Sequence, residues 1–281
     1  RQAEDVEEAR ALLRAAGSDA RIVAKIERSE AIPRLEEIVK ASDAVMVARG
    51  DLGVEVGYAQ LTGLQKRILQ LARSFDRVTI TATQMMESMI HSPVPTRAEV
   101  SDVANAVLDG SDAVMLSGES AVGKYPARAV EAMAEVIEGA ETYQLARERG
   151  RDRFEGTVDQ FAQAIAHAVM YTANHMDLEA IVALTESGST PLWMSRIRSD
   201  IPIFAFTRHE RTQRRVALYR GVYPIPFDIT GTEPAVLYRA ISKELLDRGH
   251  VKPGDEIVLT LGEFSGVSGG TNTMKLLEVE A

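Results

Sequence analysis

The stretch Arg21-Ile-Val-Ala-Lys-Ile-Glu27 (RIVAKIE) decides the fold of the first part of this chain. It is a short apolar run, which is typical of a buried strand. Side chains alternate along a strand, so Lys25 and Glu27 leave it on the same side. An ammonium and a carboxylate at the end of a buried strand are costly unless a partner neutralises both. A metal cation together with a phosphorylated substrate would do so, which indicates an enzyme.

Strand and helix patterns alternate over residues 1–150, after a leading helix predicted for Ala3–Ala16. This alternation favours a parallel sheet. Two near copies, DAVM from Asp43 and DAVM from Asp112, indicate repeated units. The predicted strands are Arg21–Glu27, Asp43–Arg49, Val78–Thr83 and Asp112–Ser117, and the helices after them are Ile32–Lys40, Leu61–Ser74, Glu99–Leu108 and Ala127–Ala140.

Polar residues stand at the carboxyl end of each of these four strands. Chemistry spread over successive strand ends is typical of a (β/α)₈ barrel, whereas an open sheet concentrates it at one switch point. Four units cannot close such a barrel. We therefore predict the second half of a TIM-type barrel, strands five to eight, within a longer protein. The polar residues are Lys25 and Glu27; Arg49, Gly50 and Asp51; Thr83 and Gln84; Ser117 and Glu119.

A charged segment separates this part from a second domain. Residues 145–159 (LARERGRDRFEGTVD) carry two glycines and no apolar period, and we interpret them as a linker. The predicted domains are therefore a half-barrel over 1–150 and a smaller α/β domain over 151–281. In the second domain we predict helices over Phe161–His175 and Ala235–Leu246, and strands over Ala180–Leu184, Ile203–Phe206, Glu256–Leu261 and Met274–Val279.

The overall composition excludes several classes of partner. A net charge of −9 disfavours nucleic acid and anionic membranes, and 5% aromatic residues disfavour base-stacking platforms. The chain has no cysteine, which excludes disulfides and thiol nucleophiles and fits an intracellular protein. No apolar run reaches the roughly 20 residues of a membrane span. The five histidines lie away from the predicted strand-end sites, which argues against a phosphohistidine mechanism.

Two groups of residues are candidate sites on their chemistry alone. Mg²⁺ takes hard oxygen ligands, often one or two carboxylates plus substrate oxygens, and Glu27 and Asp51 supply such a pair. A strand-end salt bridge with Lys25 explains the same spacing. In the second domain, Thr185-Glu-Ser-Gly-Ser-Thr190 follows a strand and opens a helix, as a phosphate cradle or an ordinary N-cap turn would. The turn at 268–271 (SGGT) would close over the same ligand.

Five motifs in order resemble the pyruvate kinase family, and the resemblance runs the whole length of the chain. It is closest to the bacterial type activated by sugar monophosphates or AMP. The motifs are IVAKIERSEAI from Ile22, MVARGDLG from Met46, ITATQMMESM from Ile80, PTRAE from Pro95 and VMLSGES from Val114, with GGTN from Gly269 near the end.

The resemblance implies a cytoplasmic homotetramer that transfers a phosphoryl group from phosphoenolpyruvate to ADP in glycolysis. It implies Mg²⁺ or Mn²⁺ on Glu27 and Asp51, and charge stabilisation by Lys25. It places the substrate carboxylate on Arg49-Gly50-Asp51 and the Thr83 hydroxyl. K⁺ would have its ligands outside this chain, and Ser117 and Glu119 would act as supporting or proton-relay groups. The effector phosphate would bind Thr185, Ser187, Gly188, Ser189 and Thr190.

Two other functions fit some of the same residues. A metal-dependent aldolase or lyase acting on pyruvate enolates would also use two carboxylates on Mg²⁺, but it would need no nucleotide and no effector loop. A non-catalytic piece that serves assembly and effector binding would need only the second domain.

Overall fold

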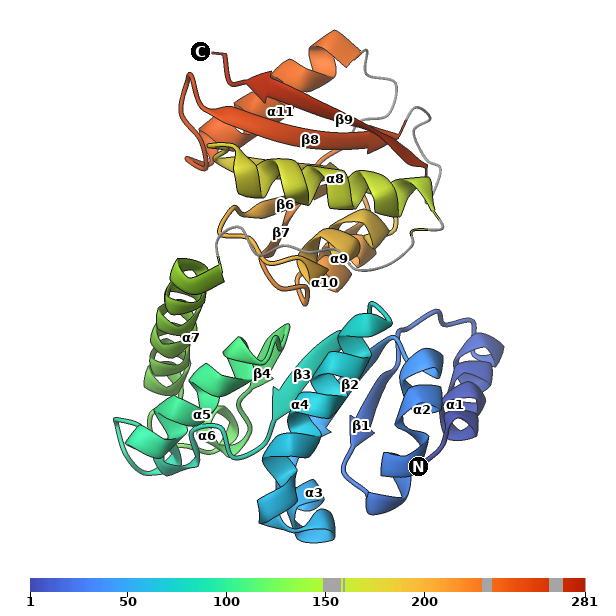
Figure 1. Ribbon diagram of the computed structural model, residues 1–281, viewed down its shortest axis with the longest axis vertical. Helices are drawn as coiled ribbons and strands as arrows, with labels where there is room; N and C mark the ends of the chain where they lie inside the picture. The colour runs from blue at the N-terminus through green and yellow to red at the C-terminus, as the bar shows by residue number, and fades with distance from the viewer. Residues whose placement is uncertain (149–157, 159, 229–233, 263–269, 281) are drawn as a thin grey trace. The chain divides into compact units, whose positions relative to one another are not determined.

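A computed structural model describes residues 1–148, 158, 160–228, 234–262 and 270–280 (Figure 1). The chain forms two compact units, Arg1–Ala146 and Arg147–Ala281, and each is described by itself. The predicted linker at 145–159 lies mostly outside the described residues, and its start is wrong, because residues 145–148 still belong to a helix.

The predicted helices and strands are present in the predicted order, and the structure adds elements that were not predicted, among them α3 and β7. In the first unit they are α1 (Ala3–Ala15), β1 (Val23–Ile26), η1 (Ser29–Arg34), α2 (Leu35–Ala41), β2 (Ala44–Ala48), α3 (Arg49–Val56), α4 (Tyr58–Ser74), β3 (Val78–Ala82), η2 (Glu87–Ile90), α5 (Arg97–Leu108), β4 (Ala113–Met115), α6 (Gly118–Ala121) and α7 (Pro126–Glu148). In the second they are α8 (Phe161–His175), β5 (Ala180–Leu184), α9 (Ser189–Arg196), β6 (Ile203–Thr207), α10 (Glu210–Val216), β7 (Val222–Pro226), α11 (Pro234–Asp247), β8 (Glu256–Gly262) and β9 (Thr271–Glu278).

The first unit contains a four-stranded sheet in the order β1-β2-β3-β4, and all three pairings are parallel. The predicted parallel α/β arrangement is therefore confirmed, and Figure 1 shows the helices packed along this sheet. Every residue of β3 is buried, as expected for a strand covered on both faces. That these strands are numbers five to eight of a barrel stays a prediction.

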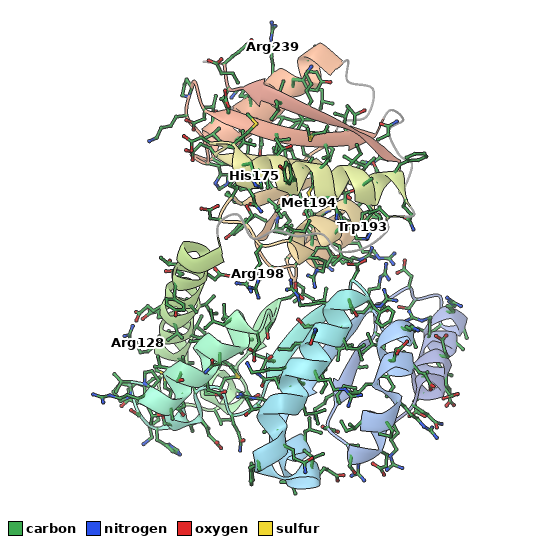
Figure 2. The ribbon with its side chains drawn as sticks, in the orientation of Figure 1. Arg128, His175, Trp193, Met194, Arg198 and Arg239 are labelled. Atoms are coloured by element: carbon green, nitrogen blue, oxygen red, sulfur yellow. The ribbon has the colours of Figure 1, made fainter. Side chains whose placement is uncertain are left out.

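Helix α4 shows why the sequence folds in this way. Its buried residues are Gln65, Ile68, Leu69 and Ala72, a spacing that puts them on one helical face, against β2 and β3. Outward-facing helix residues pair locally instead. Arg128 of α7, labelled in Figure 2, contacts Glu131 and Glu135 of its own helix.

The PTRAE motif forms the start of α5. Thr96 is the N-cap and exchanges hydrogen bonds with Glu99, a capping box. Glu99 also accepts from the amide and hydroxyl of Ser88, at 2.7 and 2.6 Å, which ties η2 to this helix. Burial raises the pKa of Glu99, but the hydrogen bonds from Ser88 and Thr96 outweigh it, so the pKa lies below its usual 4.5.

Each of the two DAVM sequences begins with an aspartate that bonds to the start of the preceding strand. Both aspartates lie where the strands of the sheet begin, which we call its amino edge. Asp43 Oδ2 accepts from the Ile22 amide at 2.9 Å, and Asp112 Oδ2 accepts from the Thr79 amide at 2.9 Å. Each aspartate therefore fastens its own strand to the start of the preceding strand. Asp43 also pairs with two arginines, Arg10 and Arg21.

The second unit contains a five-stranded sheet in the order β7-β6-β5-β8-β9, in which only the β8–β9 pairing is antiparallel. Strand β7 was not predicted, because Pro224 and Pro226 demote a strand pattern. Both prolines are tolerated at the edge of a sheet. Helix α9 packs on α8 and buries Met194, while its neighbour Trp193 is half-buried (Figure 2).

No helix among the described residues is long and apolar enough to cross a membrane.

Candidate active site and phosphate loop

The ends of β1 and β2 bring one ammonium and two carboxylates together. Lys25 Nζ forms an ion pair with Glu27 Oε2 and lies 3.8 Å from Asp51 Oδ2. The two acids come from consecutive strand ends and converge on the same group. Side-chain exposure is 49% for Lys25, 30% for Glu27 and 70% for Asp51, so a ligand can reach all three from solvent.

The ionisation of this group follows from its contacts. The contact with Glu27 raises the pKa of Lys25 above its usual 10.5, and Asp51 adds to this effect. The contact with Lys25 lowers the pKa of Glu27 below its usual 4.5. The contact thus favours the charged forms of Lys25 and Glu27, which a phosphorylated ligand and a cation require.

A second contact ties the two carboxylate-bearing segments together. Glu55 of α3 accepts from the Ser29 amide at 3.2 Å and the Ser29 hydroxyl at 2.8 Å, and it pairs with Arg28 at 3.4 Å. The Ser29 hydroxyl is the main reason that the pKa of Glu55 is lowered. Ser29 follows Glu27 by two residues and Glu55 follows Asp51 by four, so this contact joins the two segments that carry the acids.

The end of β3 is a strained turn. Thr83 and Gln84 have φ of 67° and 53°, in the left-handed region, where a β-branched residue is an outlier. Thr83 Oγ1 accepts from the Gly50 amide at 2.8 Å and donates to the Ala82 carbonyl at 2.7 Å. Strain of this kind gathers at functional sites, and here it brings Thr83 to the start of α3.

Arg49 differs from its prediction in position and in contacts. It was predicted to end a strand, but it is the first residue of α3, and Gly50 and Asp51 lie in the same first turn. The Arg49 guanidinium is buried and bonded within the protein: to Asp102 Oδ1 at 2.6 Å and to the carbonyls of Thr83 and Gln84 at 2.9 and 3.2 Å. The Arg49 side chain is therefore not available to a ligand, whereas the Asp51 side chain is exposed.

Ser117 and Glu119 form a closed structural unit at the end of β4. The buried Glu119 carboxylate accepts from the Met86 amide at 3.0 Å and from the Ser117 amide at 2.8 Å. It thereby joins the segment after β3 to the segment after β4. Gly123 closes the unit, because a Cβ there would lie 2.3 Å from the Glu119 carbonyl oxygen.

The predicted phosphate loop of the second unit follows β5 and begins α9. Gly188 is left-handed with φ 85° and caps the helix, and its amide donates to Thr185 Oγ1 at 2.9 Å. The Ser187 and Ser189 hydroxyls are 3.0 Å apart. A Cβ at residue 188 would lie 2.9 Å from Val216 Cγ1, so both conformation and space require glycine. The hydroxyls and the first amides of the helix thus lie together in one short loop.

Two side chains from the end of β6 also contact this loop, which the sequence did not reveal. His209 and Arg208, which follow β6, both pair with Glu186. The prediction that the histidines lie away from the strand-end sites is therefore wrong for His209, since neighbouring strand ends meet at one edge of the sheet. Thr190 Oγ1 lies 2.8 Å from Thr271 Oγ1, and the rest of the predicted 268–271 turn lies largely outside the described residues.

The carboxylate oxygens of Glu27 and Asp51, at the ends of β1 and β2, are suitable ligands for a divalent cation. The Glu27 and Asp51 carboxylates both contact Lys25 Nζ, and their oxygens are the hard ligands that a divalent cation prefers. Within the described ranges no group of three or more His, Cys, Asp or Glu residues could hold a metal. A pair of carboxylates completed by substrate and water oxygens is the Mg²⁺ arrangement, whereas a closed zinc site would need more protein ligands.

These features define an α/β protein that gathers an amine, two acids and a strained turn at the carboxyl edge of a parallel sheet. The chain belongs to the pyruvate kinase family. Residues 1–130 match the family's barrel domain and residues 163–277 match its alpha/beta domain.

Curated relatives agree over nearly the whole chain. Pyruvate kinase II of Salmonella typhimurium is 50% identical over 281 residues, which are 99% of this chain and 58% of the relative. The pyruvate kinase of Haemophilus influenzae is 47% identical, over 100% of this chain and 59% of the relative. That of Geobacillus stearothermophilus is 42% identical, over 98% and 47%. The chain thus spans less than two thirds of the length of these relatives.

Proposed function

We propose that this chain carries part of the active site of a pyruvate kinase, which transfers a phosphoryl group from phosphoenolpyruvate to ADP. The observation that carries the proposal is the convergence of Glu27 and Asp51 on Lys25 at one sheet edge. Phosphoryl transfer needs positioning and charge neutralisation more than covalent chemistry, and these three groups provide both. The four strands are then strands five to eight of the barrel.

Glu27 and Asp51 would hold Mg²⁺ or Mn²⁺. When bound, such an ion neutralises charge on phosphoryl and enolate oxygens. Lys25, with its raised pKa, stays protonated and presents a mobile positive charge to the transferring group. The substrate carboxylate would bind the amides at the start of α3 and the Thr83 hydroxyl, since helix amides attract anions.

The decisive experiment is the variant Lys25→Met in the full-length protein, assayed for ADP-dependent pyruvate formation. Turnover should fall about a thousandfold, while phosphoenolpyruvate still binds. Lys40→Met is the matched control, because Lys40 also forms an ion pair, with Glu36, but on the exposed face of α2. Near-normal turnover of Lys25→Met would refute the role of Lys25.

The same assay separates the alternatives. An aldolase or lyase would release or consume pyruvate without ADP, and a non-catalytic piece would do neither. No feature of the site favours these functions over phosphoryl transfer.

We further propose that the loop Thr185–Thr190 binds the phosphate of a regulatory sugar monophosphate or nucleotide. We also propose that the protein is a cytoplasmic homotetramer and that any K⁺ ligands lie outside this chain. The left-handed Gly188 and the hydroxyls of Ser187 and Ser189 support the phosphate site. Calorimetry with ribose 5-phosphate and AMP should show binding to the native protein that Ser189→Ala weakens. Equal binding to both proteins would exclude this loop.

A further inference from the structure

We infer that Arg49 and Asp102 form a clamp that holds the strained turn Thr83–Gln84 in the geometry needed for substrate binding, so that Asp102 is a positioning residue. This inference rests on the proposed function, since it explains how the substrate site is kept in shape. Asp102 lies in α5, and no motif or ligand role points to it. The elements involved, α3, β3 and α5, are labelled in Figure 1.

The turn needs an external restraint. Among the described residues, Asp76, Thr83 and Gln84 are the non-glycine residues with positive φ, and Thr83 and Gln84 are consecutive. Such conformations cost about 1–3 kcal/mol each and persist only where the surroundings fix them. Thr83 is β-branched, which makes its left-handed conformation less favourable still.

The Arg49 guanidinium supplies that restraint. One nitrogen, Nη2, donates to the carbonyls of both strained residues, at 2.9 Å to Thr83 and 3.2 Å to Gln84. The side chain is only 7% exposed, so these bonds are shielded from water. A planar guanidinium can hold several acceptors in a fixed arrangement, which a lysine ammonium cannot.

Asp102 fixes the guanidinium in turn. Its Oδ1 accepts from Arg49 Nη1 at 2.6 Å, whereas the strained turn is bonded to the other terminal nitrogen, Nη2. A carboxylate there neutralises the buried cation and sets the direction in which Nη2 points. The clamp therefore joins the start of α3, the end of β3 and helix α5.

The clamp matters for the substrate because of what lies next to it. Gly50 follows Arg49 directly, and its amide donates to Thr83 Oγ1 at 2.8 Å. Asp51, a proposed metal ligand, comes one residue later. Releasing the turn would displace Thr83 relative to these groups, and a misplacement of about 1 Å lowers enzymatic rates about a hundredfold.

The test compares Asp102→Asn with Asp109→Asn in the full-length protein. Asp109, near the other end of α5, also forms an interhelical ion pair, with Lys66 of α4, so its loss is a matched structural perturbation. For Asp102→Asn we expect kcat/KM for phosphoenolpyruvate to fall about a hundredfold, mainly through KM. KM for ADP should change less. Asp109→Asn should keep the wild-type kinetic constants, and Asp102→Glu should restore part of the loss.

Hydrogen–deuterium exchange gives a readout that does not depend on activity. Amides after β3, over residues 83–89, should exchange faster in Asp102→Asn than in wild type, and Asp109→Asn should leave them unchanged. Equal exchange and equal kinetics in the two variants would overturn the inference. If wild type itself lacks ADP-dependent pyruvate formation, the proposed function fails, while the exchange data still decide the clamp. Should Asp102→Asn not fold, Asp102→Ser, which also removes the carboxylate, carries the same comparison.

Discussion

The two edges of the four-stranded sheet both carry acids, but the chain satisfies them in different ways. At the amino edge, Asp43 receives a backbone amide and two arginines, and its side chain is only 12% exposed. At the carboxyl edge, Glu27 and Asp51 have Lys25 between them, and Asp51 is 70% exposed. The first arrangement leaves nothing for a ligand, whereas the second leaves two carboxylates that a cation can bind. The difference separates structural acids from candidate functional ones within one sheet.

The largest effect is expected from a substitution at the carboxyl edge, Glu27→Gln. Glu27→Gln should lower turnover of the full-length protein at least about a hundredfold and weaken Mn²⁺ binding, because one of two proposed ligands loses its charge. The free energy of unfolding should change by no more than about 0.5 kcal/mol. Enzyme assays, calorimetry with Mn²⁺ and urea denaturation measure the three quantities.

Glu36→Gln is the control for this change, since Glu36 pairs with Lys40 on an exposed helix face. It should behave as wild type in all three measurements. Unchanged Mn²⁺ affinity in Glu27→Gln would remove Glu27 from the metal site.

The reverse effect is expected at the amino edge. Asp43→Ala should lower the free energy of unfolding by about 3 kcal/mol, because it leaves Arg10 and Arg21 without their shared carboxylate. Mn²⁺ affinity of the folded protein should not change. Urea denaturation tests the first statement and calorimetry the second. A loss of Mn²⁺ binding without a loss of stability would contradict the division between the two edges.

Acid titration sharpens the same contrast. Burial raises the pKa of Asp43, but the Ile22 amide and the two arginines outweigh it, so the pKa in the folded protein lies below its usual 3.8. The ionised carboxylate therefore stabilises the fold at pH values above 3.8, and this contribution is lost as pH falls through the lower folded-state pKa. Thermal denaturation should be measured between about pH 5 and about pH 2, because an ordinary aspartate has a pKa of about 4. Over this range the melting temperature of wild type should fall more steeply with decreasing pH than that of Asp43→Asn. Parallel curves would show that Asp43 does not titrate with folding.

The smallest effect concerns Gly50. A Cβ there would lie 3.7 Å from Thr83 Oγ1, an ordinary contact, and α3 is helical, so Gly50→Ala should keep or raise stability by about 0.5 kcal/mol. Phosphoenolpyruvate affinity should nevertheless fall, because the methyl group would stand beside the proposed carboxylate position. Gly63→Ala in α4, where no atom lies within 4 Å of the added carbon, should raise stability without affecting the substrate. Equal substrate affinity in both variants would remove Gly50 from the binding site.

Much of this architecture could be predicted from short patterns. Strands such as Ala180–Leu184 are apolar throughout and bounded by turn residues, so their bounds agree with the prediction. Strand β7 could not be found, because its prolines break the pattern and only its place at the sheet edge permits them. The convergence of Lys25, Glu27 and Asp51 follows from parallel strand order, which the sequence indicates.

Contacts between residues far apart in the sequence could not be predicted from it. Arg49 was predicted at the end of a strand as a ligand-binding residue, but its guanidinium is bonded to Asp102, 53 positions along the chain. No local pattern predicts such a pairing. His209 was likewise missed as a partner of Glu186, since their proximity requires β5 and β6 to be neighbours.

The left-handed turn after β3 has a practical consequence for protein engineering. Replacing Thr83 with glycine or asparagine would relieve an unfavourable backbone conformation, so a screen for heat resistance would favour such replacements. The same change would remove the hydroxyl that meets the Gly50 amide. Variants selected for thermal tolerance at this position should therefore be poorer catalysts, and activity would have to be screened together with melting temperature.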